Sequence, residues 1–256
     1  MNAITDTSYE ILPFTLGPGL MSRAAIGLVV LATDQTMEYE WRKIMNLPGV
    51  AYFAARMPSP QDIQPDTLAA MRKDIATAVE MILPGIELPV VAFGCTSGAI
   101  VIGEAQVFEE IRKGKPQAVG TSPITAAKHG LAKLGARRIA LLTPYVASIN
   151  RLFQEHLQAQ GFEVSRIATF NHSNDAEVAR IDATSLKRAI LQVGAHADVD
   201  AVFVSCTSLC MCDQTRQIEQ LLGKPIVSSN SAMAWHALRL AGIPDTLPQW
   251  GRLFEV

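Results

Sequence analysis

Segments from the first half of the chain recur in the second half, displaced by 107 to 111 residues. The run 90–97 matches the run 201–208, and each contains the tripeptide Cys-Thr-Ser. Three further correspondences keep nearly the same offset: Thr33 with Thr143, Lys115-Pro116 with Lys224-Pro225, and the segment 129–135 with the segment 236–242. A near-constant offset across a strand, a motif and a helix predicts two similar α/β halves related by a pseudo-twofold axis. The cleft between such halves is the expected ligand site.

Short apolar runs alternate with helical patterns along the chain, which is typical of βα units and a parallel sheet. Several runs are apolar on both faces, as in the central strands of such a sheet. The predicted strands are 24–32, 50–57, 89–94, 117–120, 138–142, 162–170, 201–205 and 225–228. The predicted helices include 67–83, 124–134, 149–160, 175–193 and 232–241. We therefore expect an α/β fold with two Rossmann-like halves, each built on a parallel sheet.

The size and composition fit this organisation. The chain has 256 residues, of which 49% are hydrophobic, and this is enough to bury a sizeable core. The same composition excludes disorder, a coiled coil and a small disulfide scaffold. We predict four regions: a lead-in over 1–22, a first half over 23–120, a second half over 121–228, and a C-terminal helix and tail over 229–256 that packs back on the first half.

Charge is low and balanced. The 22 Lys and Arg residues and 24 Asp and Glu residues give a formal net charge of −2, without a block of like charge. Because this leaves no electrostatic footprint for a polyanion, no nucleic-acid partner is expected. The longest apolar runs are shorter than the roughly 20 residues that span a bilayer, and the N-terminus lacks the basic start and apolar core of a signal peptide. We predict a cytoplasmic protein with no membrane partner.

The four cysteines are Cys95, Cys206, Cys210 and Cys212. They are too few and too unevenly placed to cross-link a chain of this length, so we expect free thiols. Cys95 and Cys206 each follow a predicted strand, at the carboxyl end where ligands bind in open α/β sheets. A cysteine there, near the start of a helix, meets unpaired backbone N–H groups that favour the thiolate. The repeat therefore predicts two reactive thiols that face each other across one small pocket.

Two opposed thiols support two kinds of reaction without a cofactor. One thiol can remove an α-proton while the other returns a proton from the opposite side, which inverts a stereocentre. Alternatively, one thiolate can add to a double bond, allow rotation and leave again. The hydroxyls of the adjoining Thr and Ser residues can hold a carboxylate. Racemisation and cis-trans isomerisation both remain open at this point.

A purely structural role is the alternative for each cysteine. A single cysteine at a strand end is more often a small core residue than a nucleophile, but its repetition in matching Cys-Thr-Ser motifs favours function. Cys210 and Cys212 have no counterparts in the first half, and we expect no role for them. No zinc set is formed, because paired Cys-x-x-Cys spacing is missing. The Cys-x5-Arg segment ending at Arg216 contains Asp213 and no glycine, which does not suit a phosphate cradle.

Other polar candidates follow the same strand ends. Asp34 either caps the helix that follows it or contacts a ligand. Tyr145 follows the matching strand of the second half, where its hydroxyl can bind a carboxylate. Asn174 precedes a helical run and is either a cap or a ligand donor. His129 and His236 occupy equivalent helix positions, which fits packing, and no dinucleotide or metal motif predicts a cofactor.

Together these segments resemble the aspartate/glutamate racemase superfamily, and within it the branch of maleate cis-trans isomerases and arylmalonate decarboxylases. The resemblance runs from about Arg23 to Gly242. It is carried by Thr36-Met37-Glu38, by Gly-Cys-Thr-Ser-Gly at 94–98, by Thr143-Pro144-Tyr145, by Ser-Cys-Thr-Ser at 205–208 and by the segment 223–230. The chain is also similar to racemase-like proteins of ectoine-utilisation gene clusters.

The resemblance implies a cofactor-independent isomerase of a small carboxylate, commonly a homodimer, with a pseudo-symmetric α/β fold. Cys95 is implied as the nucleophile or first acid/base, and Cys206 as its partner. Carboxylate-binding roles are implied for Thr96, Ser97, Tyr145, Thr207 and Ser208. The decarboxylases of this branch lack the first cysteine, so its presence favours isomerisation over decarboxylation.

Two departures from the family pattern bear on the substrate. Maleate isomerases have an asparagine where this chain has Asp34, whose charge would repel a dicarboxylate unless protonated or paired. Amino-acid racemases have an aspartate in this loop that can meet an ammonium group, so Asp34 favours an amino-bearing substrate. The two Cys-Thr-Ser motifs differ from the Cys-Asn-Thr and Cys-Thr-His of those racemases, and this difference argues against an amino-acid substrate. A non-catalytic protein that binds an ectoine-derived or similar small acid, and a decarboxylase of the arylmalonate type, stay as alternatives.

Overall fold

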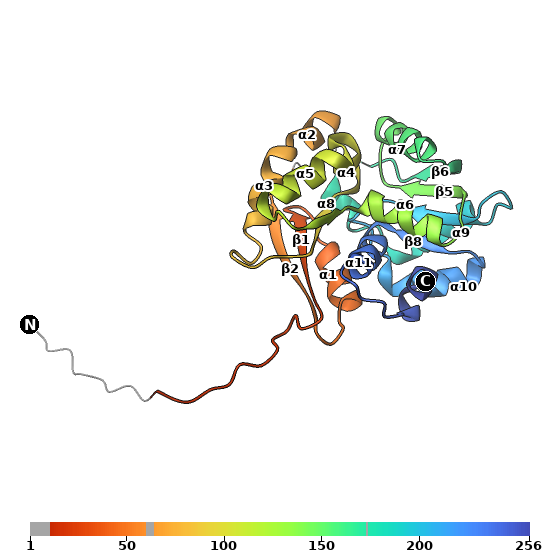
Figure 1. The fold of residues 1–256 in the computed structure, drawn as a ribbon. Coiled ribbons are helices and arrows are strands. Elements are labelled where there is room, and N and C mark those ends of the chain that lie inside the picture. The colour runs from red at the N-terminus through yellow and green to blue at the C-terminus, as the bar shows by residue number, and fades with distance from the viewer. Residues whose placement is uncertain (1–10, 60–63, 173) are drawn as a thin grey trace, which may run out of the picture.

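Two four-stranded parallel sheets form the framework of the protein (Figure 1). The computed structural model describes residues 11–59, 64–172 and 174–256. The first sheet has the order β2-β1-β3-β4 and the second β6-β5-β7-β8. Their strands are β1 (Ala24–Leu31), β2 (Val50–Met57), β3 (Val90–Gly94), β4 (Val119–Thr121), β5 (Arg138–Thr143), β6 (Glu163–Thr169), β7 (Ala201–Val204) and β8 (Ile226–Ser228). The second order repeats the first with four added to each strand number, so the predicted fold of two similar parallel halves is confirmed.

Helices cover the faces of both sheets (Figure 1). They are α1 (Met37–Ile44), α2 (Pro65–Ala70), α3 (Arg72–Glu80), α4 (Thr96–Ile102), α5 (Glu104–Gly114), α6 (Pro123–Lys133), α7 (Ala147–Ala159), α8 (Asp175–Val178), α9 (Ala183–Gly194), α10 (Cys212–Leu222) and α11 (Ser229–Leu240). Two short 3-10 helices follow at Pro248–Trp250 and Arg252–Glu255. Helix α11 packs against α6 and α1, so the end of the chain touches elements near both sheets. The boundaries between the predicted regions remain predictions.

The core lies on the central strands. All residues of β3 and of β7 are buried, as the runs without polar residues predict for strands covered on both faces. Phe93 and Phe203 are fully buried on these two strands, and truncating such a side chain costs about 3–5 kcal/mol. Cys95 and Cys206 therefore each follow a fully buried strand.

Two predicted helices are divided in the structure. The segment 67–83 forms α2 and α3, which meet at Met71 with φ −64° and ψ −22°, so the break is slight. The prediction of one helix over 175–193 is wrong, because α8 ends at Val178 and α9 begins at Ala183. Asp182 causes the second break, since its carboxylate accepts the Ser185 N–H and starts a new helix.

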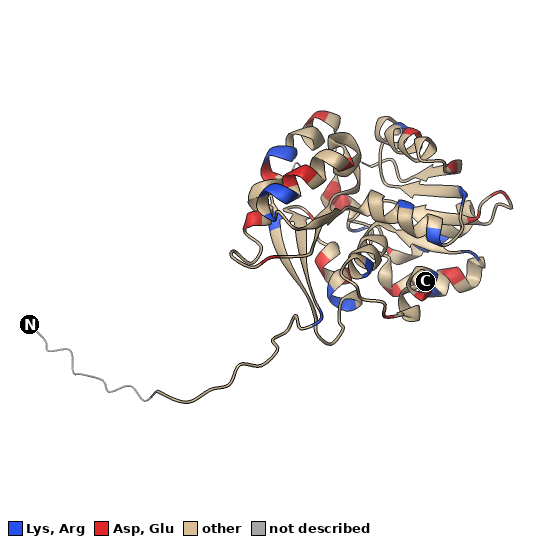
Figure 2. Cartoon of the chain, viewed as in Figure 1, with Lys and Arg blue, Asp and Glu red and all other residues tan. Residues whose placement is uncertain are grey.

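The N-terminal segment and the surface complete the description. Residues 11–22 run away from the body of the protein, while residues 1–10 of the predicted lead-in lie outside the described residues (Figure 1). Figure 2 shows basic and acidic residues interspersed on the helices around the sheets. No helix among the described residues is both long and apolar enough to cross a membrane.

Candidate active site

One cavity brings the two repeated motifs together. Cys95 follows β3 and Cys206 follows β7, which are equivalent strands of the two sheets. Both thiols are free and buried, and both line one cavity. The other lining residues are Leu31, Thr33, Leu68, Met71, Thr96, Ser97, Tyr145, Asp175 and Thr207. The cavity therefore takes residues from both halves.

Cys95 is held at the start of α4. Its sulfur accepts the Gly98 N–H at 3.2 Å and lies 3.8 Å from the Ser97 hydroxyl oxygen. A Cβ atom at position 98 would lie 2.9 Å from this sulfur and 2.8 Å from the Met71 methyl carbon. Only glycine fits this approach, so the glycine after Cys-Thr-Ser is needed to seat the thiol.

Cys206 is held differently, because no helix starts beside it. The chain turns after β7, and α10 begins only at Cys212, so the expectation of a helix start next to both cysteines is wrong for Cys206. Its N–H donates to the Ser229 hydroxyl oxygen at 3.1 Å. That oxygen lies 2.9 Å from the Thr96 hydroxyl oxygen, within hydrogen-bond distance. Ser229 thus joins the two cysteine segments.

The two thiols are protonated at neutral pH. Burial raises the pKa of Cys95 to about 11, against the opposing hydrogen bonds of Gly98 and Ser97. Burial and the charge of Asp175 raise the pKa of Cys206 to about 12. These raised pKa values run against the prediction that strand-end geometry favours the thiolate, because desolvation outweighs the hydrogen bonds.

Tyr145 lies beside the thiols, at the end of β5. Its ring stacks on Phe153 with 5.2 Å between ring centroids. Its backbone is fixed by the Thr143 hydroxyl and by Asn150, whose amide donates to the Tyr145 carbonyl at 2.8 Å. Burial, together with the charge of Cys206, raises the pKa of Tyr145 well above its ordinary value. Tyr145 is therefore a neutral hydrogen-bond donor within the cavity.

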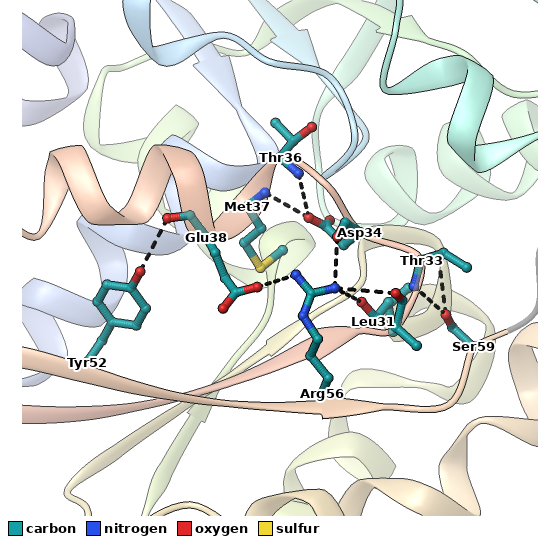
Figure 3. Close-up of polar contacts among 10 residues, drawn as sticks. Leu31, Thr33, Asp34, Thr36, Met37, Glu38, Tyr52, Arg56 and Ser59 are labelled. Atoms are coloured by element: carbon teal, nitrogen blue, oxygen red, sulfur yellow. Dashed lines mark hydrogen bonds and ion pairs between the residues drawn. The ribbon is translucent and has the colours of Figure 1, made fainter.

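The loop after β1 holds Asp34 through the contacts shown in Figure 3. Asp34 lines a hollow that shares Thr33 and Asp175 with the cavity. Its Oδ1 accepts the N–H groups of Thr36 at 2.9 Å and Met37 at 2.7 Å, so it serves as the helix cap that the sequence allows. Its Oδ2 is buried and has no hydrogen-bond partner among the described residues. Burial raises the pKa of Asp34, against these backbone hydrogen bonds, and the charge of Asp175 raises it further.

Two other predicted site residues lie behind or outside the cavity lining. The Asn174 oxygen accepts the Glu177 N–H at 3.1 Å, so this side chain caps α8, the first of its two predicted roles. The Ser208 hydroxyl donates to Asp175 Oδ1 at 2.6 Å and is thereby occupied. By contrast, the lining contains Thr96, Ser97 and Thr207.

Asp175 is the charged lining residue that the sequence analysis missed. It is the first residue of α8, it is 8% exposed, it lines the cavity, and its charge raises the pKa of both thiols. Sequence reasoning assigned the position before it, Asn174, to the site. The strand pattern could only place this loop near the cavity, because α8 is too short to show which side chain turns inward.

Glu40 is a second residue without a sequence signal. It is fully buried in α1, and its Oε1 accepts the N–H groups of Met211 at 2.6 Å and Cys212 at 2.5 Å. Its Oε2 accepts the Asn230 amide at 2.6 Å, and the same amide donates to the Thr207 carbonyl. Glu40 therefore ties the chain on both sides of the Cys206 loop to the first half.

The remaining candidates lie away from the cavity. Cys210 and Cys212 do not line it, and burial and the charge of Glu40 raise the pKa of both. His129 and His236 stack on each other between α6 and α11, with 4.6 Å between ring centroids. Burial, with the charge of His129, lowers the pKa of His236 to about 4, so it packs as a neutral ring. Within the described residues, no group of three or more His, Cys, Asp and Glu side chains could hold a metal ion.

Two parallel-sheet halves that each deliver a cysteine to a shared cavity define a class of α/β proteins with paired thiols. The model of the arylmalonate decarboxylase family matches residues 89–254. The chain belongs to this family, which confirms the resemblance inferred from the motifs.

Sequence relatives include both activities of the branch. The chain is 28% identical over 240 residues to a maleate isomerase of Nocardia farcinica, an alignment that covers 90% of this chain and 95% of the relative. It is 34% identical over 137 residues to the arylmalonate decarboxylase of Bordetella bronchiseptica, which covers 53% of this chain and 57% of the relative.

Solved structures share the fold. The maleate isomerase Iso from Pseudomonas putida S16 superposes with a TM-score of 0.82 at 22% identity, covering 90% of this chain and 98% of that chain. A cysteine-to-serine variant of Nocardia farcinica maleate cis-trans isomerase, solved with a covalently bound succinylcysteine intermediate, superposes with a TM-score of 0.81 at 27% identity and the same coverage.

Proposed function

We propose that this protein is a cofactor-independent isomerase of a small carboxylate, in which Cys95 and Cys206 act as a pair. One observation carries the proposal: two buried thiols at equivalent strand ends line the same cavity. Thr96, Ser97, Tyr145 and Thr207 supply the hydroxyls that bind carboxylate oxygens. The two isomerisations differ in the substrate bond that lies between the thiols: a carbon–carbon double bond for cis-trans isomerisation, or an α C–H bond for racemisation.

In the addition route, one thiol gives its proton to the Asp175 carboxylate, which lines the same cavity, and its sulfur forms a bond to an alkene carbon of the substrate. The thiol takes this proton back when the sulfur leaves. The π electrons of the double bond move onto the neighbouring carbon and into its carboxylate, and hydroxyl donors stabilise this charge. Rotation about the resulting single bond follows, the electron pair re-forms the double bond, and the thiolate leaves. The succinylcysteine intermediate of the Nocardia farcinica relative supports this route.

In the proton-transfer route, one thiolate takes the α-proton and the thiol on the opposite face gives its proton to the same carbon. The electron pair of the C–H bond is held in the enolate between the two steps, and the configuration inverts. No atom is gained or lost. After a turnover the two thiols have exchanged protonation states, so the reverse reaction uses them in opposite order.

Decarboxylation is the second candidate function, because the matching family model carries that description and the decarboxylase relative is 34% identical. This reaction needs only one thiol, which protonates the carbanion left after carbon dioxide departs. Isomerisation is preferred here because the cavity contains two thiols, and the second has no task in a decarboxylase.

The test uses the full chain and its Cys95→Ser and Cys206→Ser variants in deuterated water, followed by NMR. Maleate, small α-amino acids and phenylmalonate serve as substrates, with trans product, α-deuteration and loss of carbon dioxide as the three readouts. We expect isomerisation or exchange that falls at least about a thousandfold in each variant. Cys210→Ser is the matched control, since its thiol does not line the cavity, and it should keep wild-type turnover.

The outcomes separate the candidates. Turnover that survives either Ser substitution contradicts the paired-thiol mechanism. Carbon dioxide release that needs Cys206 but not Cys95 indicates the decarboxylase. Saturable binding of a small acid without product or exchange indicates a binding protein.

A further inference from the structure

The two Cys-Thr-Ser motifs use their serines in different ways. Ser97 lines the cavity, and its hydroxyl oxygen lies 3.8 Å from the Cys95 sulfur. Ser208 stands at the matching position, 111 residues later, but does not line the cavity. Its hydroxyl donates instead to Asp175 Oδ1 at 2.6 Å. The repeat therefore keeps this serine and changes its partner.

The partner, Asp175, has no counterpart in the first half. It begins α8, the helix that follows β6, whereas α2, the helix that follows β2, begins with Pro65 and contributes Leu68 to the cavity lining. Among the described lining residues Asp175 is the only carboxylate, and no Lys, Arg or His accompanies it. Asp175 is therefore the lining group that can accept a proton near neutral pH.

Ser208 and Asp175 are both enclosed. They are 2% and 8% exposed, and the Ser208 carbonyl accepts the Thr36 hydroxyl at 2.9 Å. Their oxygen–oxygen distance of 2.6 Å lies in the range of about 2.5–2.7 Å for a hydroxyl bound to a charged carboxylate. Such a bond favours the ionised carboxylate, and it is the one hydrogen bond that this side chain receives from the described residues. It holds Oδ1 and leaves Oδ2 for a second partner.

We propose that Ser208 is a positioning residue: it holds Asp175 ionised and oriented as the proton acceptor of the cavity, while the matching Ser97 stays available to the substrate. This assignment rests on the proposed function, in which a thiol must lose its proton. It differs from the carboxylate-binding role that the family resemblance implies for Ser208.

The proton transfer balances within the cavity. The S–H bond of one cysteine breaks and leaves its electron pair on sulfur, and the proton forms an O–H bond with Asp175 Oδ2. One negative charge is present before and after this step, whereas release of the proton to water would leave two charges in a buried site. Burial and the charge of Asp175 raise the pKa of both thiols, and the contribution of this charge ends once the carboxylate is protonated.

Alkylation of Cys206 provides a test that needs no substrate. The full chain is treated with iodoacetamide from pH 4 to 9, and mass spectrometry quantifies the modified Cys206 peptide. While Asp175 is ionised, its charge opposes the Cys206 thiolate, and protonation of the carboxylate ends this opposition. The rate should therefore fall about tenfold per pH unit until it reaches a flattened range below pH 7.

Ser208→Ala should move this flattened range upward by about one pH unit, because the carboxylate loses the donor that favours its ionised form. Ser208→Thr keeps a hydroxyl and should restore the wild-type profile. Asp175→Asn should abolish the flattened range. This last result excludes Tyr145 and Asp34, the other titratable groups that the charge of Asp175 affects, as its source.

Ser185→Ala is the matched control, since the Ser185 hydroxyl donates to the exposed Asp182 carboxylate at 3.2 Å and does not line the cavity. It should leave the Cys206 profile unchanged. Circular dichroism confirms that each variant is folded, and the wild type with Asp175→Asn decides the question if Ser208→Ala does not fold. The proposal is overturned by a wild-type profile without a flattened range, by a range that Ser208→Ala leaves in place, or by one that survives Asp175→Asn.

Steady-state kinetics distinguish positioning from substrate binding. With a substrate that is turned over, Ser208→Ala should lower kcat by about tenfold and change KM by less than about twofold. A KM raised about tenfold at unchanged kcat, with an unshifted Cys206 profile, would indicate instead that Ser208 binds the substrate carboxylate.

The two kinds of measurement also separate this proposal from the proposed function. A flattened range that Ser208→Ala moves upward, in a protein without cysteine-dependent turnover, supports the pair of Ser208 and Asp175 and contradicts the isomerase. Cysteine-dependent turnover with an unshifted profile supports the isomerase and overturns the role of Ser208.

Discussion

The Ser229 side chain links the two segments that carry the thiols. Its hydroxyl accepts the Cys206 N–H and lies 2.9 Å from the Thr96 hydroxyl oxygen, so one side chain sets the spacing of both motifs. Ser231 lies two residues further along α11, and its buried hydroxyl has no partner within the described chain. The two serines therefore form a natural pair for comparison.

We expect Ser229→Ala to lower the free energy of unfolding by about 1–3 kcal/mol, because the buried Cys206 N–H loses its acceptor. Turnover should fall by about tenfold, because a displaced thiol misses its reacting carbon. Chemical denaturation and steady-state kinetics measure the two effects. Ser231→Ala should change neither quantity by a comparable amount, and equal effects of both substitutions would refute the positioning role of Ser229.

The thiols themselves predict a pH dependence. Because the pKa of Cys95 is about 11 and its thiolate is the reactive form, its alkylation should accelerate about tenfold per pH unit from pH 7 to 10. Mass spectrometry of the Cys95 peptide after iodoacetamide treatment follows this rate, with N-acetylcysteine as the reference that levels off above pH 9. If the alkylation rate of Cys95 levelled off near pH 8, burial would not raise the pKa of this thiol.

At the scale of elements, α1 and the residue before it connect the two halves through hydrogen bonds. Glu40 receives two backbone N–H groups from the start of α10 and an amide from α11. The Thr36 hydroxyl, just before α1, donates to the Ser208 carbonyl at 2.9 Å. A helix of the first sheet thus determines where the Cys206 loop of the second sheet lies.

Glu40→Gln should therefore destabilise the protein and disturb the site. The amide nitrogen of the glutamine would face the Asn230 amide nitrogen, so two hydrogen-bond donors would oppose each other. We therefore expect the free energy of unfolding to fall by about 2–3 kcal/mol. Turnover should fall while binding of the carboxylate changes less, because the loop moves a reacting thiol. Glu38→Gln is the control: its partner Arg56 is 45% exposed, and such a pair contributes at most about 1 kcal/mol. Equal losses in both variants would contradict the fastening role.

The helices and strands could be predicted from the sequence where their apolar residues recur with a regular period. The strands of the central sheets are apolar on both faces and were placed within a few residues, and the Cys-Thr-Ser repeat located the two thiols. Contacts such as Glu40 with Asn230 span 190 residues and leave no periodic trace, so they needed the structure. Asp175 escaped for a related reason, since one turn of helix gives no periodicity and the adjacent Asn174 has the stronger capping preference.

At the scale of the whole molecule, Glu104 of α5 contacts two further helices, α6 and α7. It lies in α5, and its carboxylate accepts hydrogen bonds from Lys128 and Thr125 of α6 and lies 3.1 Å from the His156 ring of α7. Burial raises the pKa of Glu104, but these partners outweigh it and lower the pKa to about 2. The carboxylate therefore stabilises the folded state while it is ionised.

A group whose folded pKa is depressed contributes stability above its unfolded pKa of about 4.5 and loses it as the pH falls towards 2. We expect Glu104→Gln to lower the free energy of unfolding by about 2 kcal/mol at pH 7, and this difference from wild type to shrink between pH 4.5 and 2. Urea titrations at several pH values measure it. Glu109→Gln, on an exposed carboxylate of the same helix, should show little difference at any pH; a constant Glu104 difference down to pH 2 would refute the linkage.

The enclosure of both thiols has a further consequence for the protein at rest. Peroxide attacks thiolates, and sulfenic acid forms fastest at cysteines that are ionised and open to solvent. Cys95 and Cys206 are each 4% exposed, and burial raises the pKa of both, so the two thiols should react slowly with peroxide. Both buried sulfurs are therefore expected to resist oxidation.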